Sequence, residues 1–490
     1  MYNNFIQMKD RRHIFILLLI LIAASILRFW NFQGRYSMEA DSSRDAIVSF
    51  ESARLLQLPL TGSFSSIGPI TFGPWYYWII TFANFLIPSY WAPWMIMGLA
   101  SVIFTFVMYE VGVLVEDKNF GLLLALLSAF SPQQISSSST LTQHSLIGLL
   151  SGLIILLFLL INKSKNNSKL VILWGFFLGI AINIHFQTLG LLSLPFIYFF
   201  YTKKKSFIFY LFLGLFISMI PMLFFELNNH WFNSRNIVDY IQHGQYRIWT
   251  SNRWLTFIGK FIPDFWSYVI GIPYIISLIL IISAGIVFSI KFIRKELSVS
   301  LIIIMMSFIL QIIALRYYRG EKFIGYLQFF HPYVFLITGY MIYLLFQIFK
   351  NNSFIIAFGL ILYLYLVLPN SLKALSPNQL NLTTFKRFQT LKKEYPKSKF
   401  TTYRCFEEDL DNMQALILIL YMNNIYDKSG LKISIIHQKC DSVSGNKTLD
   451  NKLVDINTRS DDQLIKLGLH PWSPSDVYNG TARWWFKEQP

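Results

Sequence analysis

The chain is 490 residues long, 54% hydrophobic and only 14% charged, with a mean hydropathy of +0.46. This composition excludes an ordinary soluble domain and is typical of a polytopic membrane protein. The formal net charge of +16 would indicate nucleic acid in a soluble protein, but here Lys and Arg recur in short clusters between apolar runs, where they fix orientation. We therefore expect the lipid bilayer as a partner and no nucleic acid.

Basic residues set the orientation of the first span. Lys9, Arg11 and Arg12 precede the apolar run 14–30, so the N-terminus is expected in the cytoplasm. No small-residue cleavage site follows this run, which favours a retained span over a signal peptide. The first external loop is then predicted within residues 31–90.

The later apolar runs alternate in direction across the membrane. Residues 75–87 are too short to cross comfortably and predict a half-inserted helix that returns to the outer face. The run 170–201 is too long for one span and too short for two ordinary ones, so it predicts two short helices that meet outside near His185. We expect about eleven transmembrane helices within a domain of residues 1–369, with the C-terminus outside. The basic clusters that support this alternation lie at 163–169, 203–205, 291–295 and Lys350.

The first external loop opens with a dense group of charges, Glu39, Asp41, Arg44 and Asp45. The segment AIVSFESARLL that follows has the apolar spacing of a helix lying flat on a membrane. A loop punctuated by Gly and Pro comes next and ends in the aromatic cluster WYYW. Aromatic rings gather where lipid meets water, so we expect a polar segment held at one membrane face.

Polar residues from distant parts of the chain are predicted to share the external face. Ionisable groups near membrane depth are costly and usually mark a functional pathway. Each of them alone is also explained by an ordinary solvated loop, so the prediction of a common site depends on their convergence. The residues concerned are Asp41, Gln143-His144, His185, Gln187, the loop 226–266 and the cluster 316–322.

After Pro369 the composition changes, because residues 370–490 carry many charges and no span-length apolar run. The strand-like segments FTTYRC and LKISIIH flank the helix-like MQALILILYM, which predicts a small extracytoplasmic α/β domain. Cys405 and Cys440 both lie in it. An external compartment permits a disulfide worth roughly 3–4 kcal/mol in the chain-entropy model, although two buried free thiols explain the pair equally well. No zinc-like Cys/His spacing and no Gly-rich phosphate loop occur, so nucleotide hydrolysis is not supported.

The chemistry of the first loop depends on Asp41 and Arg44. An ionised aspartate can accept a proton from a nucleophilic hydroxyl or amine. Arg44 lies three residues on, on the same side of a helical turn, and its fork of donors can hold a phosphate. A local salt bridge of Arg44 with Asp41 or Asp45 is an equally good interpretation of these residues.

Several segments carry a resemblance to a known family. They are DSSRDAIV (Asp41 to Val48), LPLTG, SSIG and FGPWYYW in the first loop, then GIAINIHFQ (Gly179 to Gln187) and YLQFFHPY (Tyr326 to Tyr333). Together they resemble the protein O-mannosyltransferase-like family 39 glycosyltransferases, a group that includes the lipid A aminoarabinose transferases. The resemblance covers about residues 10–370 and not the 370–490 domain. It implies the GT-C fold, which is mainly α and polytopic.

The resemblance implies a membrane glycosyltransferase that takes a sugar from a polyprenyl-phosphate donor and inverts the anomeric centre. The acceptor would be an extracytoplasmic lipid, glycan or protein. Asp41 matches the loop aspartate of the family and is the expected catalytic base. Arg44 is expected to neutralise the donor phosphate, together with Arg316, Arg319 and Lys322. The expected residues of the substrate groove are Glu39, Asp45, Tyr76, Tyr77, His144, His185, Gln187 and His331.

Two departures from the family pattern concern acidic residues. Many members have Asp-Glu where this chain has Asp41-Ser42, so the role of that Glu is missing or taken by Glu39. Many also have an acidic residue in the second external loop, where Gln143-His144 stand here. Both departures weaken the expectation of a second catalytic carboxylate or of a metal. We expect no cofactor and leave a divalent metal open.

Two other classes of protein fit part of the pattern. A transporter or flippase for lipid-linked sugars predicts internal repeats and interrupted helices with polar groups at mid-membrane, and the two halves of the chain show no clear repeat. A polysaccharide ligase or polymerase also has many spans and a large external loop. Against it, the charged motif lies in the first loop and a soluble domain follows the spans. For the glycosyltransferase the plasma (inner) membrane is the expected location.

Overall fold

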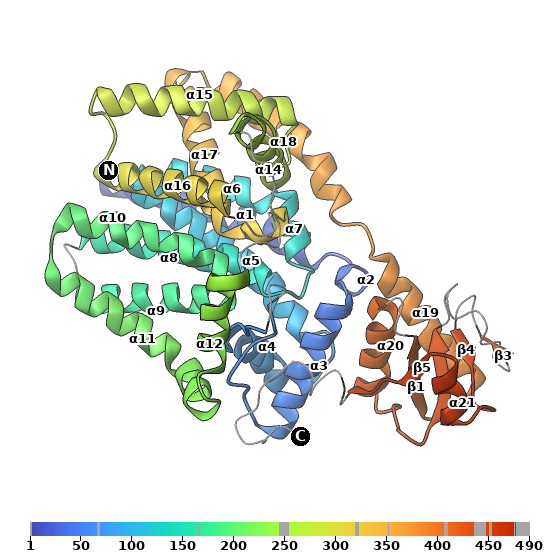
Figure 1. The fold of residues 1–490 in the computed structure, drawn as a ribbon. Helices are drawn as coiled ribbons and strands as arrows, with labels where there is room; N and C mark the ends of the chain where they lie inside the picture. Colours follow the sequence, from blue (N-terminus) through green and yellow to red (C-terminus); the bar gives the residue numbers. More distant parts are fainter. Residues whose placement is uncertain are drawn as a thin grey trace.

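The computed structural model describes residues 2–65, 69–164, 167–244, 254–318, 323–350, 352–405, 410–435, 447–449, 453–474 and 476. Figure 1 shows a body of long helices with a small α/β part beside it. In the described part of the chain, eight helices are long and apolar enough to cross a membrane. They are α1 (Tyr2–Phe29), α5 (Ala92–Val115), α8 (His144–Lys163), α11 (Lys205–Asn228), α15 (Tyr274–Ile293), α16 (Val299–Tyr317), α17 (His331–Ile348) and α18 (Ser353–Lys373).

The long helices divide into a central and a peripheral group. In α8, 67% of the most apolar stretch of the helix is buried inside the protein, whereas in α15 the buried share is 11%. The exposed side of α15 carries Ile275, Ile279, Ile282 and Ile286. An uncovered helix that is apolar all round is suited to lipid. The centre of the helical body is therefore formed by α8 and the helices α5 and α17 that pack against it.

Three shorter apolar helices complete the expected set of about eleven. They are α6 (Lys118–Ala129), α9 (Ser168–Ile184) and α10 (Ser193–Thr202), with the 3-10 helix η1 (Phe186–Leu192) before α10. The pair α9 and η1 meets at His185, as predicted for residues 170–201. A Cβ atom at Gly175 would lie 2.1 Å from the carbonyl oxygen of Leu211, so glycine is required for the close approach of α9 and α11. The predicted polytopic helical architecture is confirmed.

The connection between α1 and α5 forms α2 (Phe32–Arg35), α3 (Ala40–Leu55) and α4 (Trp75–Leu86). The predicted amphipathic helix is α3, but the expectation that its apolar face lies on the membrane is wrong. Ile47 is fully buried, and Phe50 packs edge-on against Tyr421 with ring centroids 6.1 Å apart. Since α3 packs against both α4 and α20 (Leu410–Met422), protein covers this face at Ile47 and Phe50, and only Leu55 at its end is exposed, by 41%.

The predicted external loop 226–266 is helical over most of its described part. It contains α12 (Phe232–Asp239), the π-helical turns η2 (Tyr240–Gly244) and η3 (Phe257–Phe261), α13 (Trp254–Thr256) and α14 (Ile262–Ile270). The carboxylate of Glu226 accepts hydrogen bonds from the backbone N–H groups of Asn233 and Ser234, each at 2.9 Å. An acidic group at a helix N-terminus is stabilising, so Glu226 fixes the start of α12. Two further short helices are α7 (Pro132–Ser137) and η4 (Ile324–Phe330).

The C-terminal part contains the predicted α/β elements. Its five-stranded sheet has the order β3-β4-β2-β1-β5, with β1 and β2 parallel and the other pairs antiparallel. The parallel pair is joined through α20, whose residues Ala415 to Leu420 are all fully buried. The elements are α19 (Gln379–Glu394), β1 (Phe400–Cys405), α20, β2 (Leu431–Ile435), β3 (Lys447–Thr448), β4 (Leu453–Asp455), α21 (Asp461–Lys466) and β5 (Leu469–Pro471).

The predicted disulfide falls outside the described residues. The backbone of Cys405 ends β1, but its side chain and the whole of Cys440 are not described. The disulfide therefore stays a prediction. The boundary predicted at Pro369 lies inside α18, which continues to Lys373 before α19 begins.

Candidate functional site

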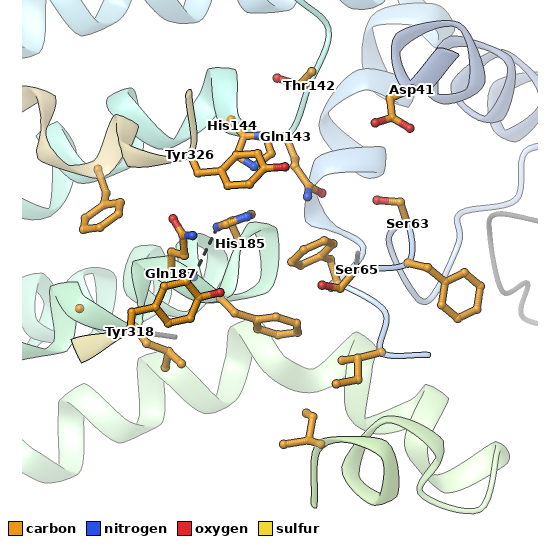
Figure 2. A pocket seen from close by; sticks show the side chains of 18 of the residues that line it. Asp41, Ser63, Ser65, Thr142, Gln143, His144, His185, Gln187, Tyr318 and Tyr326 are labelled. Atoms are coloured by element: carbon orange, nitrogen blue, oxygen red, sulfur yellow. Dashed lines mark hydrogen bonds between the residues drawn. The ribbon is translucent and has the colours of Figure 1, made fainter. Parts of the chain in front are cut away.

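A cavity of about 670 Å³ brings together most of the polar segments predicted to share one face. Figure 2 shows Asp41 on one side of it, across from His144, His185 and Tyr326. The lining residues come from α3 (Asp41, Arg44, Asp45), the first loop (Ser63, Phe64, Ser65, Ile70, Phe72), the start of α8 (Thr142, Gln143, His144), the α9–η1 junction (His185, Phe186, Gln187, Leu189, Gly190), α12 and η2 (Ile237, Tyr240), α16 and its end (Gln311, Ala314, Leu315, Tyr318) and η4 (Tyr326, Phe329).

The charged side of the cavity is built from one arginine between two carboxylates. The Nη1 atom of Arg44 donates to Asp41 at 2.6 Å, and its Nε atom donates to Asp45 at 2.9 Å. The hydroxyl of Tyr77, from α4, donates to the same oxygen of Asp45 at 2.8 Å. The Asp41 side chain is 73% exposed, whereas that of Asp45 is 4% exposed. Arg44 is therefore paired with one carboxylate that faces solvent and one that is buried.

Burial and charge act against each other in this group. Burial raises the pKa of Asp45, and the positive charge of Arg44 opposes that rise. Burial alone would lower the pKa of Arg44, but the carboxylates of Asp45 and Asp41 raise it well above its ordinary value. Arg44 therefore stays charged and is held in place by the buried carboxylate.

The last residues of the first loop, just before α4, are fixed by two hydrogen bonds. Thr71 donates its backbone N–H to the Asn233 side chain at 2.8 Å, which ties the loop to α12. Gly73 donates its N–H to the carbonyl of Asn183 at 2.7 Å, which ties it to α9. A Cβ atom at Gly73 would lie 1.8 Å from the side-chain oxygen of Asn183. Glycine is therefore required at position 73, and Phe72 is carried into the cavity beside it.

Opposite α3, the cavity wall is a cluster of rings. The His144 ring stacks on Tyr326 with centroids 4.4 Å apart and planes inclined by 17°. The His185 ring lies 4.5 Å from that of His144 and stacks on Phe72 at 5.4 Å. Such a wall offers flat apolar faces together with imidazole nitrogens, a combination suited to a polar ring such as a sugar.

The structure brings six of the predicted site residues to this cavity, namely Asp41, Arg44, Asp45, His144, His185 and Gln187. Tyr76 and Tyr77 do not line it. Both are buried, and Tyr77 contributes to the site only indirectly, through its hydrogen bond to Asp45. Glu39 is also absent from the lining. It is exposed beside the first residue of α3, and its side chain caps no N–H of that helix.

Two further predicted residues are placed away from the cavity. His331 is fully buried at the start of α17, where its Nδ1 atom hydrogen-bonds to the Gln134 side chain at 2.7 Å. The prediction that it lines the groove is wrong, because its side chain is fully buried and does not reach the cavity. The guanidinium of Arg316 lies over the Trp254 ring at 5.2 Å instead of lining the cavity. Arg319 and Lys322 lie outside the described residues, so their predicted contacts with phosphate stay predictions.

Several lining residues were not predicted as site residues. Gln311 is 98% buried, and its amide nitrogen donates to the hydroxyls of Ser307 and Tyr333, both at 2.9 Å. A lone amide within an otherwise apolar span is costly unless it is bonded, and this signal is present in the sequence. No comparable local signal marks Ile237 or Leu189, which reach the cavity only through the tertiary packing.

The lining also limits what the site can bind. Over the described residues Arg44 is the sole cation of the lining, and no group of three or more His, Cys, Asp or Glu side chains is arranged to hold a metal ion. The expectation of no cofactor stays a prediction. Chemically, the arrangement offers an exposed carboxylate, an arginine, an aromatic wall and an apolar side formed by residues such as Leu189, Ala314 and Leu315.

Comparisons with known proteins support the fold. No protein-family model matches the sequence, and no curated protein matches it significantly. The structure is similar to ArnT from Cupriavidus metallidurans, both in the apo state and bound to undecaprenyl phosphate, with a TM-score of 0.50 and 12% identity over 83% of this chain and 75% of that one. The predicted GT-C architecture is thereby confirmed.

A second similar structure is the oligosaccharyltransferase of Archaeoglobus fulgidus in complex with Zn and sulfate. The TM-score is 0.49 and the identity 14%, over 78% of this chain and 56% of that one. The chain thus spans little more than half the length of the archaeal protein.

Proposed function

We propose that the chain is a membrane glycosyltransferase that moves a sugar from a polyprenyl-phosphate donor to an extracytoplasmic acceptor, with inversion. The observation that carries the proposal is the exposed Asp41 paired with Arg44 at the edge of a cavity with an apolar side. The first-loop motif supports placing the chain near the family 39 enzymes. The GT-C fold is compatible with this assignment, and ArnT of that fold has been seen with undecaprenyl phosphate.

The proposed reaction uses Asp41 as the general base. The acceptor hydroxyl or amine attacks the anomeric carbon from the face opposite the phosphate, and its proton passes to the Asp41 carboxylate. The bond between the anomeric carbon and the phosphate oxygen breaks, and its electron pair leaves with the polyprenyl phosphate. One glycosidic bond forms as one glycosyl phosphate bond is lost, and the configuration inverts.

The leaving phosphate develops negative charge that a cation can stabilise. Arg44 uses Nε for Asp45 and Nη1 for Asp41, and we assign its Nη2 group to the phosphate. The predicted cations Arg319 and Lys322 would supplement it. Arg316 is assigned a lesser role, since its guanidinium lies over Trp254.

The remaining parts of the cavity suit the rest of the donor. The sugar would lie between α3 and the ring cluster of His144, His185 and Tyr326. The first units of the prenyl chain would lie on the apolar side, near Leu189 and Leu315, and leave toward lipid. An in-line displacement would then require the acceptor, activated by Asp41, to approach the anomeric carbon from the side away from the phosphate.

The test is a transfer assay in purified membranes that contain the chain, with undecaprenyl-phosphate-linked radiolabelled hexoses and pentoses as donors. We expect one donor to lose its label to an endogenous acceptor and to release free undecaprenyl phosphate. Membranes with Asp41→Asn serve as the matched control. A donor that only changes leaflet, with its glycosyl phosphate bond intact, would contradict the proposal and support a transporter.

A further inference from the structure

The C-terminal domain contacts the segment that leads into α3. Asn378, just before α19, donates its backbone N–H to the carbonyl of Gly34 at 2.7 Å. The side chain of Asn381 accepts the N–H of Met38 at 3.2 Å and donates to the carbonyl of Tyr36. This domain therefore holds the backbone immediately before the charged group of the site.

The same domain contacts α3 near both of its ends. Toward the C-terminal end, the Tyr421 hydroxyl of α20 donates to the carboxylate of Glu51. At the N-terminal end, the backbone N–H of Ala40 donates to the carboxylate of Asp411 at 2.6 Å. Figure 1 shows α20 beside α3 at the border of the two parts. One helix of the soluble domain thus spans most of the helix that carries the site.

The contact of Asp411 replaces a missing helix cap. The first N–H groups of an α-helix have no partner inside the helix and are usually bonded by the side chain that precedes it. In α3 that preceding residue is Glu39, whose side chain makes no capping bond. Ala40 is the first residue of α3 and the immediate neighbour of Asp41, so the capping carboxylate comes from another domain.

We propose that Asp411 is a positioning residue for Asp41. The inference rests on the proposed function. Arg44 is anchored by the buried Asp45 and stays in place without Asp411. Asp41 is 73% exposed, and within the described part of the chain its one ion pair is with Arg44, so its place depends on the first turn of α3. A carboxylate at the N-terminus holds that turn.

The test compares three variants of the whole 490-residue chain. Asp411→Ala removes the cap, and we expect the kcat for sugar transfer to fall roughly fivefold, the rate factor that corresponds to the stabilisation typical of one helix cap. The KM for the polyprenyl-phosphate sugar should change less than twofold, because Arg44 and the apolar side are untouched. Asp411→Asn keeps an oxygen acceptor and should recover most of the rate. Tyr421→Phe removes a bond from the same interface near the far end of α3 and should leave kcat unchanged.

A second measurement does not depend on transfer activity. Hydrogen–deuterium exchange of the peptide covering residues 38–45 should be faster in Asp411→Ala and unchanged in Tyr421→Phe. If the wild-type protein transfers no sugar, the proposed function fails while this measurement still decides whether Asp411 holds the turn. Unchanged exchange in Asp411→Ala would overturn the inference. Equal losses of kcat in Asp411→Ala and Tyr421→Phe would also overturn it, since they would point to general docking of the domain.

Discussion

The substitution Asp41→Asn separates the two interpretations of the Asp41–Arg44 pair. Asparagine keeps the shape of the side chain and an oxygen that can accept from Arg44, but it cannot take up a proton at neutral pH. If Asp41 is the general base, transfer should fall by at least about 10²-fold. That loss corresponds to roughly 3 kcal/mol or more in the activation barrier.

The structure gives the scale of the competing effect. The Asp41 side chain is 73% exposed, and an ion pair with an exposed partner contributes about 0–1 kcal/mol because water screens it. A role limited to the salt bridge would therefore change transfer by no more than about fivefold. The two interpretations differ by more than tenfold in rate, which a transfer assay resolves easily.

The assay should follow label from the donor identified in membranes, with protein level and melting temperature measured in parallel. Glu39→Gln is the matched control, because it removes an exposed carboxylate two positions away that does not line the cavity. We expect it to transfer at the wild-type rate. Near wild-type transfer by Asp41→Asn would refute the assignment of the base and remove the main support of the enzyme hypothesis.

Three further outcomes follow from the fold. Gly73→Ala should lower the melting temperature, because its Cβ would collide with a neighbouring side chain, while Gly285→Ala, inside α15 with nothing within 4 Å, should not lower it, since alanine favours a helix; an unchanged melting temperature in Gly73→Ala would contradict the packing of the first loop. A reporter fused after Lys373 should be active only outside the cytoplasm, and activity in the cytoplasm would contradict the predicted orientation. Cys405 and Cys440 should label with a thiol reagent only after reduction, and free labelling beforehand would exclude the disulfide.

The sequence predicted the helices well because hydropathy and basic clusters are local properties. Even the short pair that meets at His185 could be inferred, since the length of the run 170–201 allows few alternatives. Asp41 and Arg44 lie on one helical turn, so their proximity was also predictable. In each case the information lies within a few residues of the feature.

The parts that failed depend on partners far away in the chain. The apolar spacing of α3 indicates a lipid-facing side, because it does not reveal Tyr421, whose ring packs on Phe50 from the C-terminal part of the chain. The segment around His331 does not reveal that Gln134, 197 positions away, hydrogen-bonds to its ring. Whether a polar side chain faces a cavity or the core is decided by packing, and a single sequence does not contain that packing.

The remaining prediction concerns the different roles of Asp45 and Asp41, the two carboxylates that bind Arg44. Both hydrogen bonds to Asp45 end on one oxygen, so Asp45→Asn can keep the bonds and loses only the charge. Asp45→Ala removes both bonds and leaves Arg44 without its buried counter-ion, which should cost roughly 3–5 kcal/mol of stability.

We therefore expect the melting temperature to fall in the order wild type, Asp45→Asn, Asp45→Ala, whereas Asp41→Asn should stay close to wild type. Thermal unfolding in detergent, alongside the transfer assay, checks this order. The buried carboxylate holds the arginine, and so the exposed one is left to exchange its partner when substrate binds. A stable Asp45→Ala protein that has lost transfer would contradict this division and make Asp45 the better candidate for the base.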